Sequence, residues 1–167
     1  SHIQFGDKFP DVVQVLQRAR DADVGYQIIV GCTAKDSYQA LEFVQSNGPN
    51  LWSTLGVHPH NADEWNDDLR QRYLVTAKSE KLVVAVGEIG LDYFRNLTPQ
   101  DVQIKVFIEQ LKLALELDKP VIVHVRDAWE DALKILQEVG NQRVVLHCFT
   151  GTFEQAQICW ERGYYTS

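Results

Sequence analysis

The segment Lys119–Ala128, which reads KPVIVHVRDA, contains the pattern that best indicates the fold of this chain. Its central run, Val121–Val125, is apolar except for one histidine and does not alternate polar with apolar residues. Both faces of such a strand have to be buried, which is typical of a strand in a parallel sheet. The polar residues His124, Arg126 and Asp127 gather where the run ends.

Similar runs recur on both sides of this stretch, and they begin about one βα unit apart. They are Gln27–Val30 (QIIV), Leu51–Val57 (LWSTLGV), Leu82–Val86 (LVVAV) and Arg143–Leu146 (RVVL). Apolar residues with helical spacing lie between them, in residues 13–19, 40–44, 104–115, 132–139 and 153–160. Thr98 and Pro99 predict the start of one helix, with the Thr98 hydroxyl as its N-cap.

Alternating strands and helices indicate an α/β protein with a parallel sheet, either a doubly wound open sheet or a (β/α)8 barrel. The chain contains neither a G-x-G-x-x-G fingerprint nor a P-loop, which open sheets use to bind phosphate. Polar residues instead follow strand after strand, at the end where barrel enzymes build their sites. We therefore expect a (β/α)8 barrel of the TIM type.

Composition excludes several classes of protein. With 45% hydrophobic and 23% charged residues, the 167-residue chain is expected to form a single globular domain. It contains no apolar run near the ~18 residues of a membrane span, and its first residues lack the pattern of a secretory leader, so nothing in them predicts a secreted protein. Its three cysteines, without a Cys-x-x-Cys motif, are expected to be reduced and packed as small apolar groups, so we expect a cytoplasmic protein.

The net charge of −7 argues against a broad basic surface for nucleic acid. It leaves open a site at which a bound metal, and not the protein surface, attracts phosphate. Imidazole and carboxylate groups gather at the predicted strand ends, and together they suit Zn or Mn, or Mg if carboxylate and water dominate. These groups belong to His2, His58, His60, Glu88, His124 and His147.

Taken singly, each of these residues has an ordinary explanation: a strand-end histidine that satisfies hydrogen bonds, or a glutamate that forms a loop salt bridge. Glu88 nevertheless follows an apolar run, and burial of its charge is costly without a positive partner. No lysine or arginine lies near Glu88 in sequence, so a metal ion would serve as its positive partner.

Four motifs resemble, in this order and spacing, the TatD family of metal-dependent deoxyribonucleases, which are amidohydrolase-like (β/α)8 hydrolases. They are GVHPH (56–60), GEIGLDY (87–93), KPVIVHVRDA (119–128) and LHCFTG (146–151), and the resemblance extends over the whole chain. It implies a hydrolase that uses two divalent cations (Mg, Mn or Zn) and metal-activated water to trim single-stranded DNA from 3′ to 5′. Single strands or strand ends of DNA would be its partner, with no membrane and no obligate protein partner.

The resemblance also implies roles for particular residues. Glu88 corresponds to the catalytic carboxylate that bridges two cations, and His124 and His147 correspond to imidazole ligands of the second cation. The resemblance also implies that the phosphate of the substrate lies near His58, His60 and Arg126.

Both ends of the chain depart from the family pattern. The family often opens with His-x-His-Leu-x-Phe on its first strand, and Ser1–Phe5 fits best with His2 as the second histidine and metal ligand, because Ile3 and Phe5 then take the apolar positions. In the other register, Gln4 would replace that second histidine.

The family's Glu-Thr-Asp-Ala-Pro segment, whose aspartate completes the metal site, is absent, and Gly163–Ser167 resembles the start of a seventh strand. The resemblance therefore implies one hydrolase domain over residues 1–167 that is incomplete at both ends, with exposed strand edges and a weakened metal site.

Two other functions remain open. One is an amide, ester or lactone hydrolase of the same superfamily, although such enzymes often carry a bridging lysine where this chain has Glu88. The other is a non-catalytic structural or interaction module.

Overall fold

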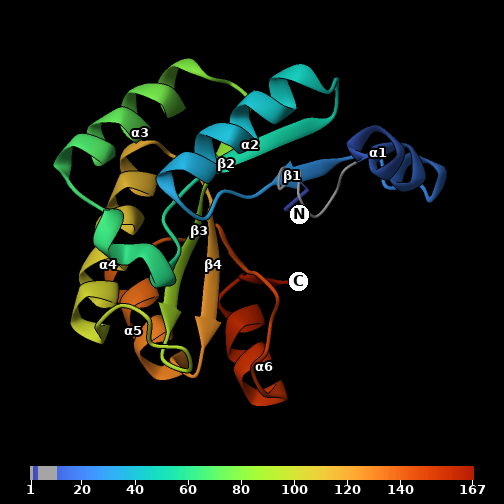
Figure 1. Ribbon diagram of the computed structural model, residues 1–167. Coiled ribbons are helices and arrows are strands. Elements are labelled where there is room, and N and C mark those ends of the chain that lie inside the picture. The colour runs from blue at the N-terminus through green and yellow to red at the C-terminus, as the bar shows by residue number, and fades with distance from the viewer. Residues whose placement is uncertain (1, 4–10) are drawn as a thin grey trace.

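The computed structural model describes residues 2, 3 and 11–167, and it shows one curled parallel sheet (Figure 1). Six strands pair in sequential order, each parallel to its neighbours. The described part of the chain therefore follows the strand order of a barrel and leaves the barrel open, which confirms the predicted fold class. The strands are β1 (Gln27–Ile29), β2 (Leu51–Leu55), β3 (Val83–Asp92), β4 (Val121–Arg126), β5 (Val144–Leu146) and β6 (Tyr165–Thr166).

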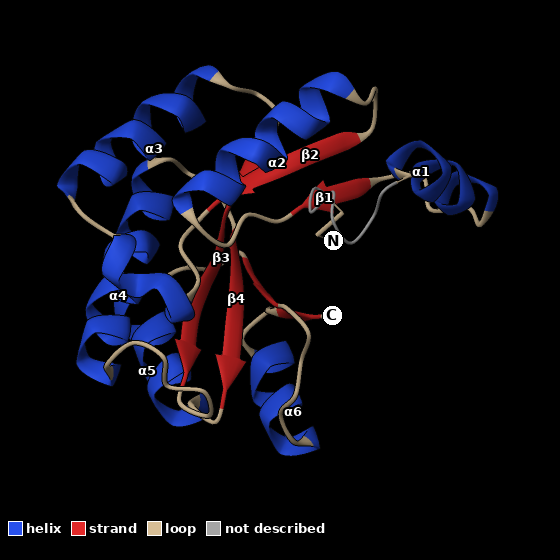
Figure 2. Cartoon of the chain, in the orientation of Figure 1, coloured by secondary structure: helices blue, strands red, loops and turns tan. Residues whose placement is uncertain are grey.

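Helices connect the strands and lie around the sheet, as Figure 2 shows in blue. The expected alternation of strand and helix is thereby confirmed. The helices are α1 (Val12–Asp21), α2 (Ala34–Ser46), α3 (Asp67–Ser79), α4 (Gln100–Glu116), α5 (Trp129–Val139) and α6 (Phe153–Glu161), with a 3-10 helix, η1, at Pro59–Glu64. Within the described residues, no helix combines the length and apolar character needed to cross a membrane.

Strand β3 is longer than the predicted Leu82–Val86 and continues to Asp92. Its register against β4 shifts between Val86 and Ile89, so one extra residue is accommodated on β3, and pairing then resumes as far as Asp92 and Arg126. The glycines around Glu88 look like loop signals in the sequence, yet they permit close strand contact. A Cβ atom at Gly90 would overlap the His124 carbonyl oxygen. Glu88 is therefore inside a strand and does not follow one.

Other boundaries also differ from the sequence-based expectations. Helix α3 was not expected, although it buries Leu69, Tyr73, Leu74 and Ala77 along one face. Thr98 does not cap α4: Pro99 takes the N-cap position, and the Thr98 hydroxyl donates a hydrogen bond to the His60 carbonyl oxygen at 3.1 Å. The expected strand at residues 1–5 lies largely outside the described residues, and the expected seventh strand is β6.

The two faces of the sheet have different environments. On β4, Val121, Val123 and Val125 pack into the main core beneath the helices. Because side chains alternate along a strand, Ile122 and His124 point to the other face. Ile122 belongs there to a small separate cluster with Val30 and Ala85. His124 thus lies on the face of the sheet that the helices do not cover.

Helix α4 fixes the ends of two strands through two buried glutamines. The Gln110 side chain accepts a hydrogen bond from the Val57 N–H at 2.8 Å and donates one to the Val57 carbonyl at 3.0 Å. The Gln103 side chain accepts one from the Asp92 N–H at 2.8 Å and donates to the Asp92 carbonyl at 3.2 Å. Backbone groups that lack a partner strand at these points are therefore satisfied by side chains, which holds the residues next to His58 in place.

We expect Gln110→Leu to lower the free energy of unfolding by about 2–4 kcal/mol, because both polar groups of Val57 would lose their buried partner. Urea denaturation monitored by circular dichroism measures this change. Lys112→Leu, at an exposed position of the same helix, should change stability by less than about 0.5 kcal/mol. Equal stability of Gln110→Leu and the unmodified protein would show that water reaches Val57.

Candidate metal centre

Glu88 lies at the centre of the polar face. Its side chain is only 6% exposed, and its two oxygens face different histidines. Glu88 Oε1 lies 3.3 Å from His124 Nδ1, and Glu88 Oε2 lies 3.6 Å from His2 Nε2. Burial raises the pKa of Glu88, but the hydrogen bond from His124 and the charges of the surrounding histidines outweigh it and lower the pKa to about 2. The carboxylate is therefore ionised at neutral pH.

Two sets of donor atoms share this carboxylate. One set comprises His2, Glu88 and His147, and the other comprises His58, Glu88 and His124; within each set the donor atoms lie within 4.8 Å of one another. A divalent cation needs donors that can converge to about 2 Å from a common point, and small side-chain movements would achieve this. The structure thus brings together the predicted ligands His2, Glu88, His124 and His147, and it also places His58 beside them.

His2 is oriented toward this centre by the backbone. Its Nδ1 lies 3.1 Å from the Val30 carbonyl oxygen, which can only accept a hydrogen bond. A proton held on Nδ1 leaves the lone pair of Nε2 directed toward Glu88, the tautomer that a metal ligand requires. His147 follows β5, and its ring centroid lies 5.7 Å from that of His2. Burial lowers the pKa of His147, which favours the neutral imidazole.

Asp92 is a site residue that the sequence-based predictions missed. Its buried Oδ2 lies 3.0 Å from His124 Nε2 and 2.8 Å from His60 Nε2, so one carboxylate oxygen holds two histidines. Oδ1 accepts a hydrogen bond from the Arg95 N–H at 2.8 Å. Asp92 lies four residues after Glu88 on the same strand, and His124 lies between the two acids. The GEIGLDY motif contained this residue, but its spacing alone did not indicate a shared partner.

The pKa of His124 reflects these two neighbours. Burial lowers the pKa, but the hydrogen bonds and charges of Glu88 and Asp92 outweigh it and raise the pKa above its ordinary value. His58 behaves differently, because burial and the neighbouring His124 lower its pKa to about 3. One histidine of the touching pair is thus neutral at neutral pH, while the other readily holds a proton when no cation is bound; their ring centroids lie 4.4 Å apart.

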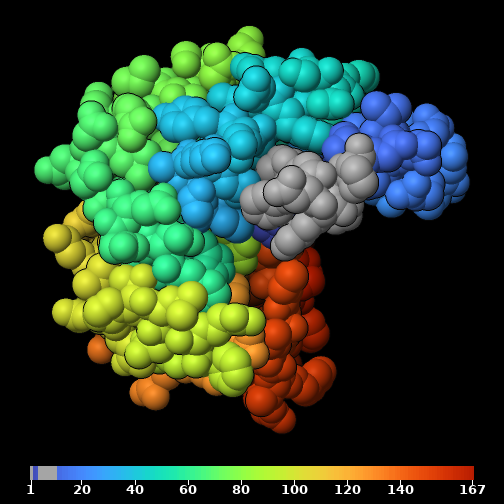
Figure 3. Space-filling view, in the orientation of Figure 1, coloured from blue at the N-terminus to red at the C-terminus, as the bar shows by residue number. Residues whose placement is uncertain are grey.

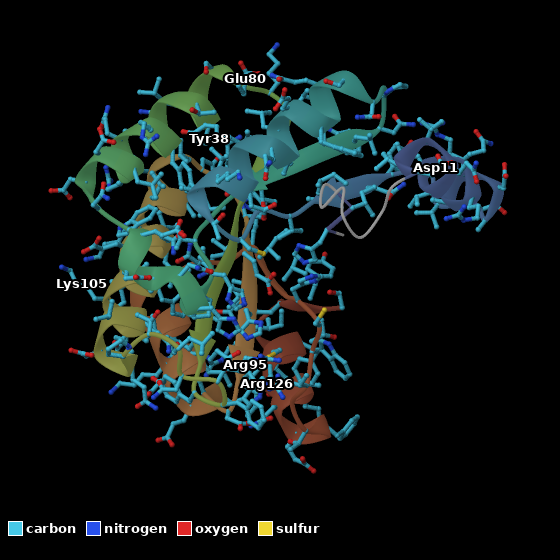
Figure 4. All side chains as sticks on the ribbon, viewed as in Figure 1. Asp11, Tyr38, Glu80, Arg95, Lys105 and Arg126 are labelled. Atoms are coloured by element: carbon cyan, nitrogen blue, oxygen red, sulfur yellow. The ribbon has the colours of Figure 1, made fainter. Side chains whose placement is uncertain are left out.

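The remaining predicted residues lie around this centre. His60 contacts both His58, at a ring-centroid distance of 4.3 Å, and Asp92. Arg126 is at the end of β4, two residues beyond His124, and its guanidinium stacks on the Phe94 ring (Figure 4 labels Arg126).

The three cysteines have separate environments, and all are free thiols. Cys159 is fully buried in the core, as expected, whereas Cys148 is exposed. Cys32 is not simply apolar filling: its Sγ lies 3.7 Å from Glu88 Oε2 and 3.8 Å from His2 Nδ1. Burial, and then the charge of Glu88, raise the pKa of Cys32 far above neutral pH, so the thiol is protonated.

Comparisons with known proteins all identify TatD-related proteins as similar to this chain. The family model described as TatD related DNase matches residues 1–167. Among curated relatives, proteins named 3'-5' ssDNA/RNA exonuclease TatD are 40% identical over 152 residues in Erwinia amylovora and 41% identical over 155 residues in Pantoea ananatis. These matches cover 90% and 92% of this chain but only 58% and 59% of the relatives. The chain thus spans about three fifths of the length of the curated relatives it matches.

Solved structures give the same result. A TatD homologue from Escherichia coli K12 superimposes with a TM-score of 0.89 at 32% identity, covering 99% of this chain and 64% of that chain. A TatD-family hydrolase from Entamoeba histolytica superimposes with a TM-score of 0.81 at 30% identity, covering 91% of this chain and 54% of that chain.

We expect Asp92→Asn to lower the pKa of His124 by roughly 1 unit or more in chelator-treated protein, because the variant removes a negative charge in contact with the ring. Titration of the histidine ring protons by NMR measures this. Asp101→Asn, which removes an exposed charge from the first turn of α4, is the matched control and should leave the pKa unchanged. An unshifted His124 in Asp92→Asn would mean that Glu88 alone sets its pKa.

Proposed function

Because the chain belongs to the family of TatD-related DNases, we propose that it is a metal-dependent nuclease that removes nucleotides from single-stranded DNA in the 3′ to 5′ direction. The observation that carries the proposal is the buried Glu88, whose two oxygens face different histidines. The names of the curated relatives support single-stranded substrates, RNA included. In this proposal residues 1–167 belong to a single hydrolase domain, and the three free thiols fit a reducing, cytoplasmic location.

The residues proposed to hold two divalent cations, Mg, Mn or Zn, are His2, Glu88, His124 and His147. When bound, such cations make hydroxide available near neutral pH and stabilise the oxygens of a phosphodiester undergoing displacement. The donor set fits this role, since a buried ionised carboxylate needs positive charge and His2 Nε2 lies 3.6 Å from it.

Asp92 is proposed to set the orientation and tautomer of His124. With the proton of Nε2 directed to Asp92, the Nδ1 atom is the one available toward Glu88. The same aspartate oxygen fixes His60, so both rings keep their positions when substrate enters. This is the usual support of a metal-binding histidine by a carboxylate outside the metal's own shell.

His58 is proposed to bind substrate phosphate rather than a cation. Its Nδ1 accepts a hydrogen bond from the His60 N–H at 3.2 Å. The neutral ring therefore carries its proton on Nε2, which makes Nε2 a donor to an oxygen and a poor metal ligand. His60 and Arg126 are proposed to assist with phosphate, and a guanidinium suits that role.

We expect Glu88→Gln to reduce metal-dependent cleavage of a labelled single-stranded oligonucleotide by more than roughly 100-fold, because the loss of a direct ligand should exceed the 10–100-fold cost of losing a supporting residue. Cleavage by the unmodified protein should stop on addition of chelator. Glu138→Gln, an exposed site on α5, is the matched control and should cleave normally.

Isothermal titration calorimetry with Mn²⁺ separates binding from catalysis in the same variants. Glu88→Gln should bind Mn²⁺ much more weakly than Glu138→Gln does. Cleavage by Glu88→Gln at the unmodified rate, with the same metal requirement, would assign Glu88 a structural role and refute the proposed site.

Salt dependence tests how phosphate is held. If a few groups such as bound cations and Arg126 hold it, few counterions are released, and the slope of log affinity against log salt concentration should be on the order of −1 to −3. Fluorescence anisotropy of a labelled oligonucleotide at several salt concentrations gives the slope. A slope near about −6 would require a basic groove that the net charge of −7 does not suggest.

A further inference from the structure

A cavity of about 470 Å³ opens beside the candidate metal centre. It shares His124 with that centre, so the cavity and the centre lie next to each other. Figure 3 shows the yellow-green surface of the segment after β3 next to the red surface of the C-terminal segment. The residues that line the cavity include Phe94, His124, Arg126, Asp127, Cys148 and Thr150.

Phe94 forms an exposed aromatic wall of this cavity. The residue is 60% exposed, and it belongs to none of the hydrophobic clusters of the described chain. One face of its ring carries the Arg126 guanidinium, whose central carbon lies 3.8 Å from the ring centroid. The stack is fixed by the sheet, because Asp92 pairs with Arg126 and the Tyr93 N–H donates to the Arg126 carbonyl at 2.9 Å.

The charges around this stack suit a nucleic acid strand. Arg126 ends β4, and Arg95 lies in the turn that follows the neighbouring strand β3 (Figure 4); neither forms an ion pair with any residue in the described parts of the chain. Two unpaired guanidinium groups are therefore available in a chain whose net charge is −7. Asp127 also lines the cavity and would repel phosphate, which directs the phosphate toward the arginine side.

We propose that the Phe94–Arg126 stack is a platform for a nucleobase of the single-stranded substrate. The base stacks on the open part of the Phe94 ring, while the N–H groups of Arg126 bind the neighbouring phosphate. Because every base has an aromatic face, this platform binds without sequence preference, as single-strand binding proteins do. The proposal rests on the proposed nuclease function and specifies how that site holds its substrate.

The test compares two oligonucleotides of equal length, oligothymidylate and the same strand with abasic sites, binding to the protein with Ca²⁺ in place of a catalytic metal. Phe94→Ala should weaken oligothymidylate binding by about 5- to 150-fold, the range that corresponds to loss of one stacked base. It should leave binding of the abasic strand unchanged. Phe94→Tyr should restore binding, and Leu97→Ala, an exposed apolar residue of the same loop outside the cavity lining, should have no effect.

The possible failures are distinguishable. Equal binding of both strands by the unmodified protein, or an equal loss for both strands in Phe94→Ala, would overturn the stacking platform, while cleavage with Mn²⁺ would leave the nuclease function intact. If the unmodified protein neither binds nor cleaves either strand, the proposed function fails and the platform fails with it.

Discussion

The structure depends on the buried carboxylate of Glu88, whose negative charge has to be compensated by positive or hydrogen-bonding groups. Glu88 is inside a strand with 6% of its side chain exposed, and an ionised group in that position is costly unless charge or hydrogen bonds compensate it. Its partners come from the N-terminal segment, from the residues after β2 and β5, and from β4. The parallel sheet, whose strands follow one another in order, brings these distant segments to a single carboxylate. The site therefore depends on this strand order.

The local sequence was sufficient to predict the buried strands and the polar residues at their ends. Unbroken apolar runs such as Val121–Val125 predicted buried parallel strands, and the polar residues at their ends predicted where Glu88 and His124 would meet. Helix α3 was missed although Leu69, Tyr73 and Ala77 recur every four residues, as on one face of a helix, and all three are buried. Threonine is a residue type that often caps helices, but the Thr98 hydroxyl instead donates a hydrogen bond to the His60 carbonyl oxygen.

Features that depend on register could not be predicted in this way. The extra residue accommodated on β3 between Val86 and Ile89 sets which side chains lie opposite β4, and through them the pairing of Asp92 with His124. Nothing in the spacing of Glu88 and Asp92 indicates that one histidine would lie between them. The contact of Cys32 with Glu88 joins residues that are far apart in sequence and likewise depends on the assembled sheet.

The proximity of His2 and His147 has a consequence for the order of folding. Their rings lie 5.7 Å apart, although nearly the whole described chain separates them in sequence. Contacts between distant residues require the closure of long loops, which is entropically costly, so we expect this contact to form after the neighbouring strands have paired. The central strands can therefore assemble before the site is complete. A ligand that binds only the completed site stabilises the last-formed contacts between the outer segments and thereby acts on folding as well as on chemistry.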